Sequence, residues 1–143
     1  MNYKAPVRDL LFSLREAADF GRLEAAFPAA DGETLQAVLE AAGVFASDVL
    51  APLNRPGDIA GARFENGAVR AAPGFGDAYK AFAEGGWNGL TADPEFGGQG
   101  LPKALEIAVF EMIQAANMAF GRPWPPKAGS AARPFQPPWA KAL

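Results

Sequence analysis

Two pairs of carboxylates are the only residues whose types and spacing suggest acid–base chemistry: Asp93 with Glu95, and Glu106 with Glu111. The chain has no His and no Cys, which removes the commonest general base, the commonest metal ligands and all thiol chemistry. Its three serines therefore lack the usual activating partner. Since no basic residue stands beside either carboxylate pair, we expect these acids to be solvated. The sequence predicts no catalytic, cofactor-binding or metal-binding residue.

The stretch from Gly85 to Pro102 is expected to be a loop that the rest of the fold holds in place. It contains six glycines and two prolines, a composition that excludes a helix. It also carries large apolar residues that a solvated linker does not need, namely Trp87, Leu90, Phe96 and Leu101. We interpret Trp87 as a side chain that fixes this loop on the helices, in preference to a ring that stacks on a flavin or an adenine.

A short motif inside this loop, Gly97-Gly98-Gln99, matches the tripeptide with which peptide-release factors position water at the ribosome. That tripeptide works in a basic setting suited to RNA phosphates, whereas Asp93 and Glu95 precede it here. A phosphate-binding loop is also excluded, because Lys103 is not followed by Ser or Thr. Residues 1–121 carry nine basic and sixteen acidic residues, a net charge of −7, so we expect no binding to nucleic acid.

Hydrophobic periodicity predicts four helices. The first covers residues 7–20 and ends at Gly21. The second has Asp31 as its N-cap and ends at residues 50–53, where Pro52 stops it. Residues 54–58 are expected to form a turn, and residues 62–70 a two-stranded hairpin around Asn66-Gly67, too short to be stable unless it lies on the helices. The third helix covers residues 75–84.

The fourth helix is expected to run from Pro102 to Phe120. Its core stripe is Leu105, Val109, Met112, Ala116 and Ala119. Three large apolar residues fall on the opposite side, among Lys103, Glu111, Gln114 and Asn117; they are Ile107, Phe110 and Met118. A helix that is apolar nearly all round needs protein on both faces. We therefore expect the side with Ile107, Phe110 and Met118 to take part in self-association or in another interface.

Two segments carry a family resemblance. Residues 78–90 (AYKAFAEGGWNGL) and 93–102 (DPEFGGQGLP) resemble the N-terminal helical domain of flavin-dependent acyl-CoA dehydrogenases, and residues 3–9 (YKAPVRD) are similar to the long branch of that family. The resemblance covers residues 3–121. It implies a parent enzyme that removes hydrogen from the α and β carbons of an acyl-CoA, with FAD as hydride acceptor and a further protein as electron acceptor. The catalytic carboxylate and the flavin contacts lie in later domains of the family, so no residue of this chain inherits either role.

The character of the chain changes after Gly121. Residues 122–143 contain six prolines, four basic residues and no acid, and we expect this tail to be disordered. One interpretation makes Pro123-Trp124-Pro125-Pro126 a polyproline ligand for an aromatic groove. The other makes the tail an out-of-frame translation, and its excess of Arg, Pro, Ala and Gly favours this second interpretation.

The sequence thus predicts an all-α orthogonal helical bundle with a small β-hairpin over residues 1–121 and a disordered tail over 122–143. The favoured function is that of a truncated N-terminal portion of an acyl-CoA dehydrogenase, which binds no FAD and is inactive alone. The alternative is a free-standing interaction module with a polyproline tail. The absence of Cys, of a signal peptide and of a long apolar run favours the cytoplasm, with no membrane span.

Overall fold

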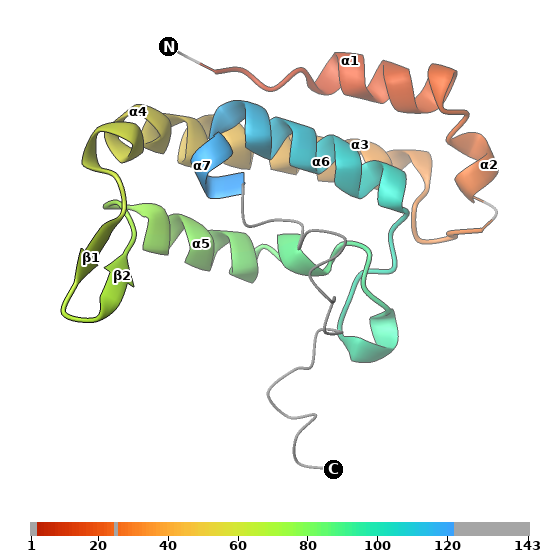
Figure 1. Cartoon of the computed structure of the whole chain (residues 1–143). Coiled ribbons are helices and arrows are strands. Elements are labelled where there is room, and N and C mark those ends of the chain that lie inside the picture. Colours follow the sequence, from red (N-terminus) through yellow and green to blue (C-terminus); the bar gives the residue numbers. More distant parts are fainter. Residues whose placement is uncertain (1–2, 25, 122–143) are drawn as a thin grey trace.

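Helices make up most of the part of the chain that the computed structural model describes, residues 3–24 and 26–121 (Figure 1). They are α1 (Val7–Phe12), the π-helical η1 (Ser13–Ala17), α2 (Gly21–Glu24), α3 (Gly32–Val44), the π-helical η2 (Phe45–Leu50), α4 (Ala51–Ala60), α5 (Phe75–Glu84), α6 (Lys103–Ala116) and α7 (Met118–Gly121), with the 3₁₀ turns η3 (Trp87–Gly89) and η4 (Pro94–Phe96). The two strands β1 (Arg63–Glu65) and β2 (Ala68–Arg70) form the only sheet of the described residues. The predicted all-α class with a β-hairpin is confirmed.

The N-terminal helix is shorter than the predicted span of residues 7–20. α1 runs directly into η1, which ends at Ala17, and only Leu10 and Leu14 are buried. Asp19 then adopts a left-handed conformation with φ of 49°, which reverses the chain. Gly21 consequently begins α2 instead of ending the first helix, so that part of the prediction was wrong.

The second predicted helix is longer than expected, since it continues past residues 50–53 to Ala60. Asp31 caps it as predicted, since one carboxylate oxygen accepts the backbone N–H of Thr34 at 2.7 Å. Pro52, however, does not end it: α3, η2 and α4 form one continuous helix from Gly32 to Ala60. The wider π-helical turn of η2 precedes Pro52 and places it in the first turn of α4, where its missing N–H costs little.

The predicted turn at residues 54–58 is wrong, because these residues lie inside α4, where Gly57 has a packing role. A Cβ on Gly57 would lie 2.6 Å from the ring of Phe75, so the glycine lets α5 approach the helix closely. Gly43 of α3 serves the same purpose at the other end, because a Cβ there would lie 2.8 Å from Val7. Sequence alone assigned Gly57 to a turn, whereas the fold uses it for packing.

One side of α6 packs on α3, in front of which it lies in Figure 1. Its predicted core stripe is confirmed at four positions that are at most 2% exposed, namely Leu105, Val109, Met112 and Ala116. Ala119 is exposed, because the helix breaks at Asn117, whose backbone is extended with φ of −155°. Asn117 itself is 1% exposed, although the sequence had placed it on the polar side.

A buried amide explains that break. The Asn117 side chain donates to the Leu50 carbonyl at 3.2 Å and accepts the backbone N–H of Phe120 at 3.1 Å. The first bond joins α6 to the end of η2 and the second caps α7. Asn117 therefore connects two helices that are 67 residues apart in the sequence.

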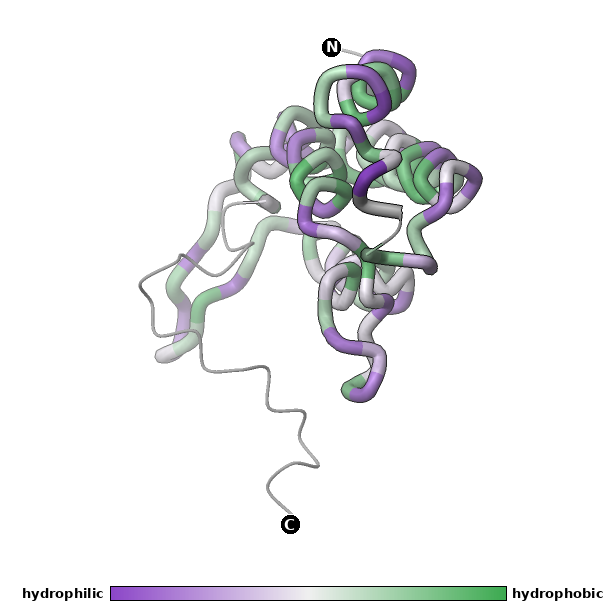
Figure 2. The backbone as a smooth tube through the Cα atoms, turned by 90° about the vertical axis from the view of Figure 1, so that its right-hand side faces the viewer, coloured by the Kyte–Doolittle hydropathy of each residue, from purple (hydrophilic) through white to green (hydrophobic). Residues whose placement is uncertain are grey.

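The hairpin forms as predicted, with Phe64 opposite Val69 and with positive φ at Asn66 and Gly67. It does not lie on the helices, since all six of its strand residues are exposed. Figure 2 shows the hairpin extending away from the helices, with hydrophobic and hydrophilic positions alternating along it. Phe64 and Val69, which share one face as a cross-strand pair, are 74% and 73% exposed, so the described chain leaves this apolar face of the ribbon uncovered.

The continuous helix from Gly32 to Ala60, 29 residues long, is long and apolar enough to cross a membrane by length and composition. This is weak evidence, because the core helix of a globular domain passes the same test. Leu35, Leu39 and Leu50 of this helix are fully buried within the bundle. The predicted tail at residues 122–143, its disorder included, lies outside the described residues.

Candidate functional site

The glycine-rich loop at residues 85–102 is folded back on itself by backbone hydrogen bonds. Gln99 N–H donates to Gly89 at 2.9 Å, and Leu101 N–H donates to Leu90 at 2.8 Å. Asp93 caps the turn η4, with its carboxylate accepting the Glu95 N–H at 2.9 Å. Backbone groups that would bind water in a flexible connection are paired within the loop here, so the loop has a defined shape.

Apolar side chains fix this loop on the bundle, as the sequence predicted. Leu90 and Leu101 are 2% and 4% exposed. The half-buried ring of Trp87 stacks on Phe45 of η2, with ring centroids 6.3 Å apart. Phe96 does not take part, since it is 55% exposed at the tip of the loop. Three of the four predicted anchors are therefore confirmed and Phe96 is wrong.

The Gly97-Gly98-Gln99 motif has a structural use. A Cβ on Gly98 would collide with the backbone carbonyl of Ala92, so the second glycine is needed for the loop to close. The Gln99 side-chain amide donates to the Gly86 carbonyl at 3.1 Å. In a release factor the amide of this glutamine would position water, whereas here the Gln99 amide joins the two ends of the loop through its hydrogen bond to Gly86.

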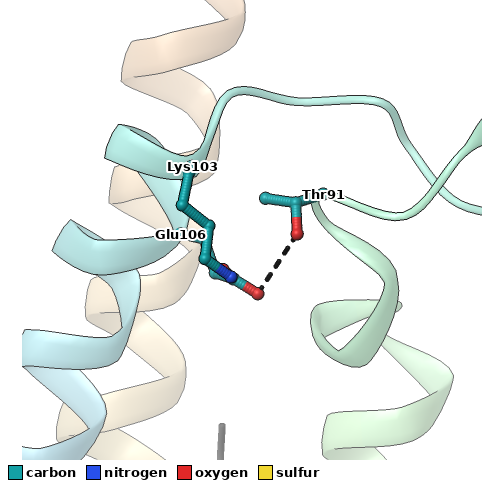
Figure 3. A network of polar contacts seen from close by, with 3 residues as sticks. All are labelled: Thr91, Lys103 and Glu106. Atoms are coloured by element: carbon teal, nitrogen blue, oxygen red, sulfur yellow. Dashed lines mark hydrogen bonds and ion pairs between the residues drawn. The ribbon is translucent and has the colours of Figure 1, made fainter. Parts of the chain in front are cut away.

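Glu106 is the one carboxylate among the predicted pairs that the structure buries. It is 7% exposed in the first turn of α6, and it accepts a hydrogen bond from the Thr91 hydroxyl at 3.3 Å (Figure 3). Its other carboxylate oxygen forms an ion pair with Lys103. The prediction that Glu106 is solvated was wrong, because loop residue Thr91 and helix residue Lys103 together satisfy both oxygens. Glu106 thus joins the loop to α6, and its partner in sequence, Glu111, is exposed.

A shallow apolar concavity of about 640 Å³ opens between α4, α5, α7 and the ends of the hairpin. Its walls are mainly aromatic rings and small residues, including Phe75, Tyr79, Phe120, Ala72 and Gly61. Tyr79 of α5 is 63% exposed here. Asp58 is the one charged residue of this lining, so the concavity presents apolar surface and offers little polar recognition.

The outer face of α6 is a second uncovered apolar surface. We define it by Lys103, Ile107, Phe110, Glu111, Gln114 and, just beyond the helix, Met118. Ile107 and Met118 are 60% and 64% exposed, and Phe110 is half-buried. The predicted exposure of apolar side chains on this side is confirmed for Ile107 and Met118 and only in part for Phe110.

The arrangement offers two apolar contact surfaces, and two of the candidate carboxylates are engaged within the fold. Asp93 and Glu106 are both occupied in local hydrogen bonds, and no group of three or more metal-ligating side chains gathers in residues 3–24 and 26–121. Sequence reasoning assigned Glu106 and Asn117 to solvated positions, which was wrong, and it missed the concavity. A signal for Glu106 was available, since an acid in the first helical turn is favoured by the helix dipole.

A helical bundle that carries this glycine-rich loop agrees with the acyl-CoA dehydrogenase resemblance of residues 78–102, and a comparison with known proteins confirms the resemblance. The chain is 38% identical over 123 residues, 85% of its length, to 3-methylmercaptopropionyl-CoA dehydrogenase of Ruegeria pomeroyi. It spans about a fifth (21%) of the length of that enzyme. No family model matches the chain.

Proposed function

We propose that residues 3–121 are the N-terminal helical domain of an FAD-dependent acyl-CoA dehydrogenase. The observation that carries this proposal is the 38% identity over 123 residues to an enzyme named for that activity. The exposed concavity beside the hairpin supports it, because it is an apolar surface on which further parts of such an enzyme could pack.

In this proposal the domain contributes surface and shape, and the rest of the enzyme contributes chemistry. The carboxylates of Asp93 and Glu106 serve the loop and its helix, and we assign the removal of the α-proton to a later domain. A single wall of a pocket buries too little of a ligand to hold it, so the isolated chain binds no FAD and oxidises no acyl-CoA. The absence of Cys from the chain favours a cytoplasmic location.

A chimera tests the proposal directly. The segment of the Ruegeria pomeroyi enzyme that matches this chain is replaced by the corresponding residues of this chain, and the purified chimera is examined for bound flavin. We expect a yellow protein whose flavin absorbance bleaches when the enzyme's own acyl-CoA is added without an electron acceptor. A chimera that folds and carries flavin, but whose flavin is not reduced by acyl-CoA, contradicts the proposal.

The isolated 143-residue chain is the matched control for that experiment. We expect a colourless preparation whose titration into FAD leaves the flavin fluorescence unchanged. Stoichiometric binding of FAD to the isolated chain would show that the domain holds the cofactor unaided, contrary to the proposal.

The second candidate function is that of a free-standing interaction module. The observation that favours it is the outer face of α6, because a missing domain and a missing partner protein leave the same kind of apolar surface. Pro123-Trp124-Pro125-Pro126 would recruit an aromatic-groove domain in this case. In a pull-down with such domains, loss of capture on Pro126→Ala supports the module, and no capture by the unchanged chain rejects it.

The gene itself separates the two candidates. We propose, from the composition of residues 122–143, that these residues are translated out of frame. Sequencing the locus from independent clones should show a second frame, open from the codon after Gly121, that continues α7 with small and apolar residues. Stop codons in every shifted frame within a few dozen positions would reject the enzyme fragment and favour the module.

A further inference from the structure

The outer face of α6 carries one positive and one negative residue at equal distances from its central apolar residue. Lys103 precedes Ile107 by four residues, and Glu111 follows it by four. At 1.5 Å of rise per residue, each charge lies about 6 Å along the helix from Ile107. Lys103 and Glu111 are both exposed, and Ile107 is 60% exposed.

This symmetry makes the face complementary to itself in one orientation. If a second copy of α6 runs antiparallel about a two-fold axis at Ile107, the Lys103 of each copy lies at the level of the Glu111 of the other. Two pairs of opposite charge result. A parallel arrangement in register would place like charges side by side, which is unfavourable.

The sizes of the side chains fit the same orientation. About the same axis, the large ring of Phe110 in one copy lies at the level of Ala104 in the other. Phe110 and Ala104 are both half-buried in the single chain. The small side chain of Ala104 on one copy therefore leaves room at the level of the Phe110 ring on the other. Large residues that pack against small ones are typical of close helix–helix contacts.

Lys103 can take part although it already pairs with Glu106 in its own chain. Its side chain is 63% exposed while that of Glu106 is 9% exposed, so the ammonium group lies at the surface above the buried acid. An ammonium group has three donors. One serves Glu106 and the remaining ones are available to a carboxylate of a neighbouring molecule.

We propose that two copies of this chain associate through the outer faces of α6, antiparallel, about a two-fold axis at Ile107. The isologous contact uses the same surface on both copies, as closed dimers do. It concerns contact between copies of the chain and does not depend on the dehydrogenase proposal. Because the axis passes at Ile107, that residue is the one position of this face that meets its own counterpart.

The absence of native cysteines allows a direct test. In the full 143-residue chain, Ile107→Cys places two thiols across the proposed axis, within reach of a disulfide. Val44→Cys on α3 is the matched control, because Val44 is also 60% exposed and lies away from the proposed contact. Under mild oxidation in dilute solution, we expect Ile107→Cys to form a covalent dimer at least tenfold faster than Val44→Cys.

Sedimentation velocity over a range of concentrations measures the association without a new thiol. The unchanged chain should show a reversible dimer, and Glu111→Lys should weaken it about threefold to tenfold, because two exposed ion pairs are lost. The exposed Glu40→Lys on α3 changes the net charge equally and should leave the dimer intact. Equal rates for the two cysteine variants, or a monomer at every concentration, would overturn the inference and leave the face to another occupant.

Discussion

Asn117 provides the sharpest test of how the structure is held together. Asn117→Ala removes the bond to the Leu50 carbonyl and the bond from the Phe120 N–H, at a site that is 1% exposed. A hydrogen bond contributes about 0.5–1.5 kcal/mol, and a buried group left without a partner costs about 1–3 kcal/mol. We therefore expect a loss of about 2–4 kcal/mol in the free energy of unfolding.

That loss is large against the stability of a domain, which is about 5–15 kcal/mol in total. It corresponds to a fall in Tm of roughly 8–16 °C, at about 4 °C for each kcal/mol in a domain of this size. The assay is urea denaturation followed by far-ultraviolet circular dichroism. The midpoint should fall while the m value stays constant, because the surface exposed on unfolding is unchanged.

The matched control is Asn54→Ala, which removes the same side chain from an exposed position of α4. We expect that variant to lie within about 0.5 kcal/mol of the unchanged chain. If Asn117→Ala costs no more than Asn54→Ala, the buried amide does not join α6 to η2 in solution, and the reasoning from these two bonds is refuted.

Three further outcomes are expected. Tyr3→Phe should raise stability by about 1 kcal/mol, because the Tyr3 hydroxyl is buried without a hydrogen-bond partner; since burial and then the charge of Glu111 raise the pKa of Tyr3 above 10.0, the variant should also lose less stability above pH 10. Thermal denaturation should show that Gly98→Ala strongly destabilises the loop, whereas Gly76→Ala in α5, where a Cβ meets nothing within 4 Å, stabilises by about 0.5–1 kcal/mol; equal effects would contradict the loop geometry. Hydrogen bonds from backbone amides lower the pKa of Asp31 below 3.8. The contribution of Asp31 to the stability of the fold is therefore present above pH 3.8 and is lost as the pH falls through the lowered pKa. In an acid titration followed by circular dichroism, Asp31→Asn should lack this loss of stability.

The two pKa predictions have opposite signs for a physical reason. The folded protein disfavours the phenolate of Tyr3, so the free energy of unfolding is unaffected by this group below pH 10 and falls as the pH rises through the raised pKa. It favours the charged carboxylate of Asp31, which donates nothing and accepts the N–H of Thr34. A Tyr3→Phe variant with the same alkaline unfolding profile as the unchanged chain would show that Tyr3 does not cause the loss of stability above pH 10.

The local elements were within reach of the sequence because they depend on neighbours along the chain. The cap at Asp31, the positive φ at Asn66 and Gly67, and the three-and-four spacing of Leu105, Val109 and Met112 are each properties of short segments. The acyl-CoA dehydrogenase resemblance also rested on contiguous letters. Short-range geometry fixes these features whatever the remainder of the chain does.

Tertiary contacts decided the features that the sequence assigned wrongly. Pro52 and Gly57 look like helix breakers, yet a π-helical turn admits the first and the ring of Phe75 packs on the second. Glu106 and Asn117 look like surface residues, yet Thr91 and Leu50 supply partners that bury them. A polar group can be buried only where another segment satisfies its hydrogen bonds, and no periodicity along one helix reveals which distant segment will be there.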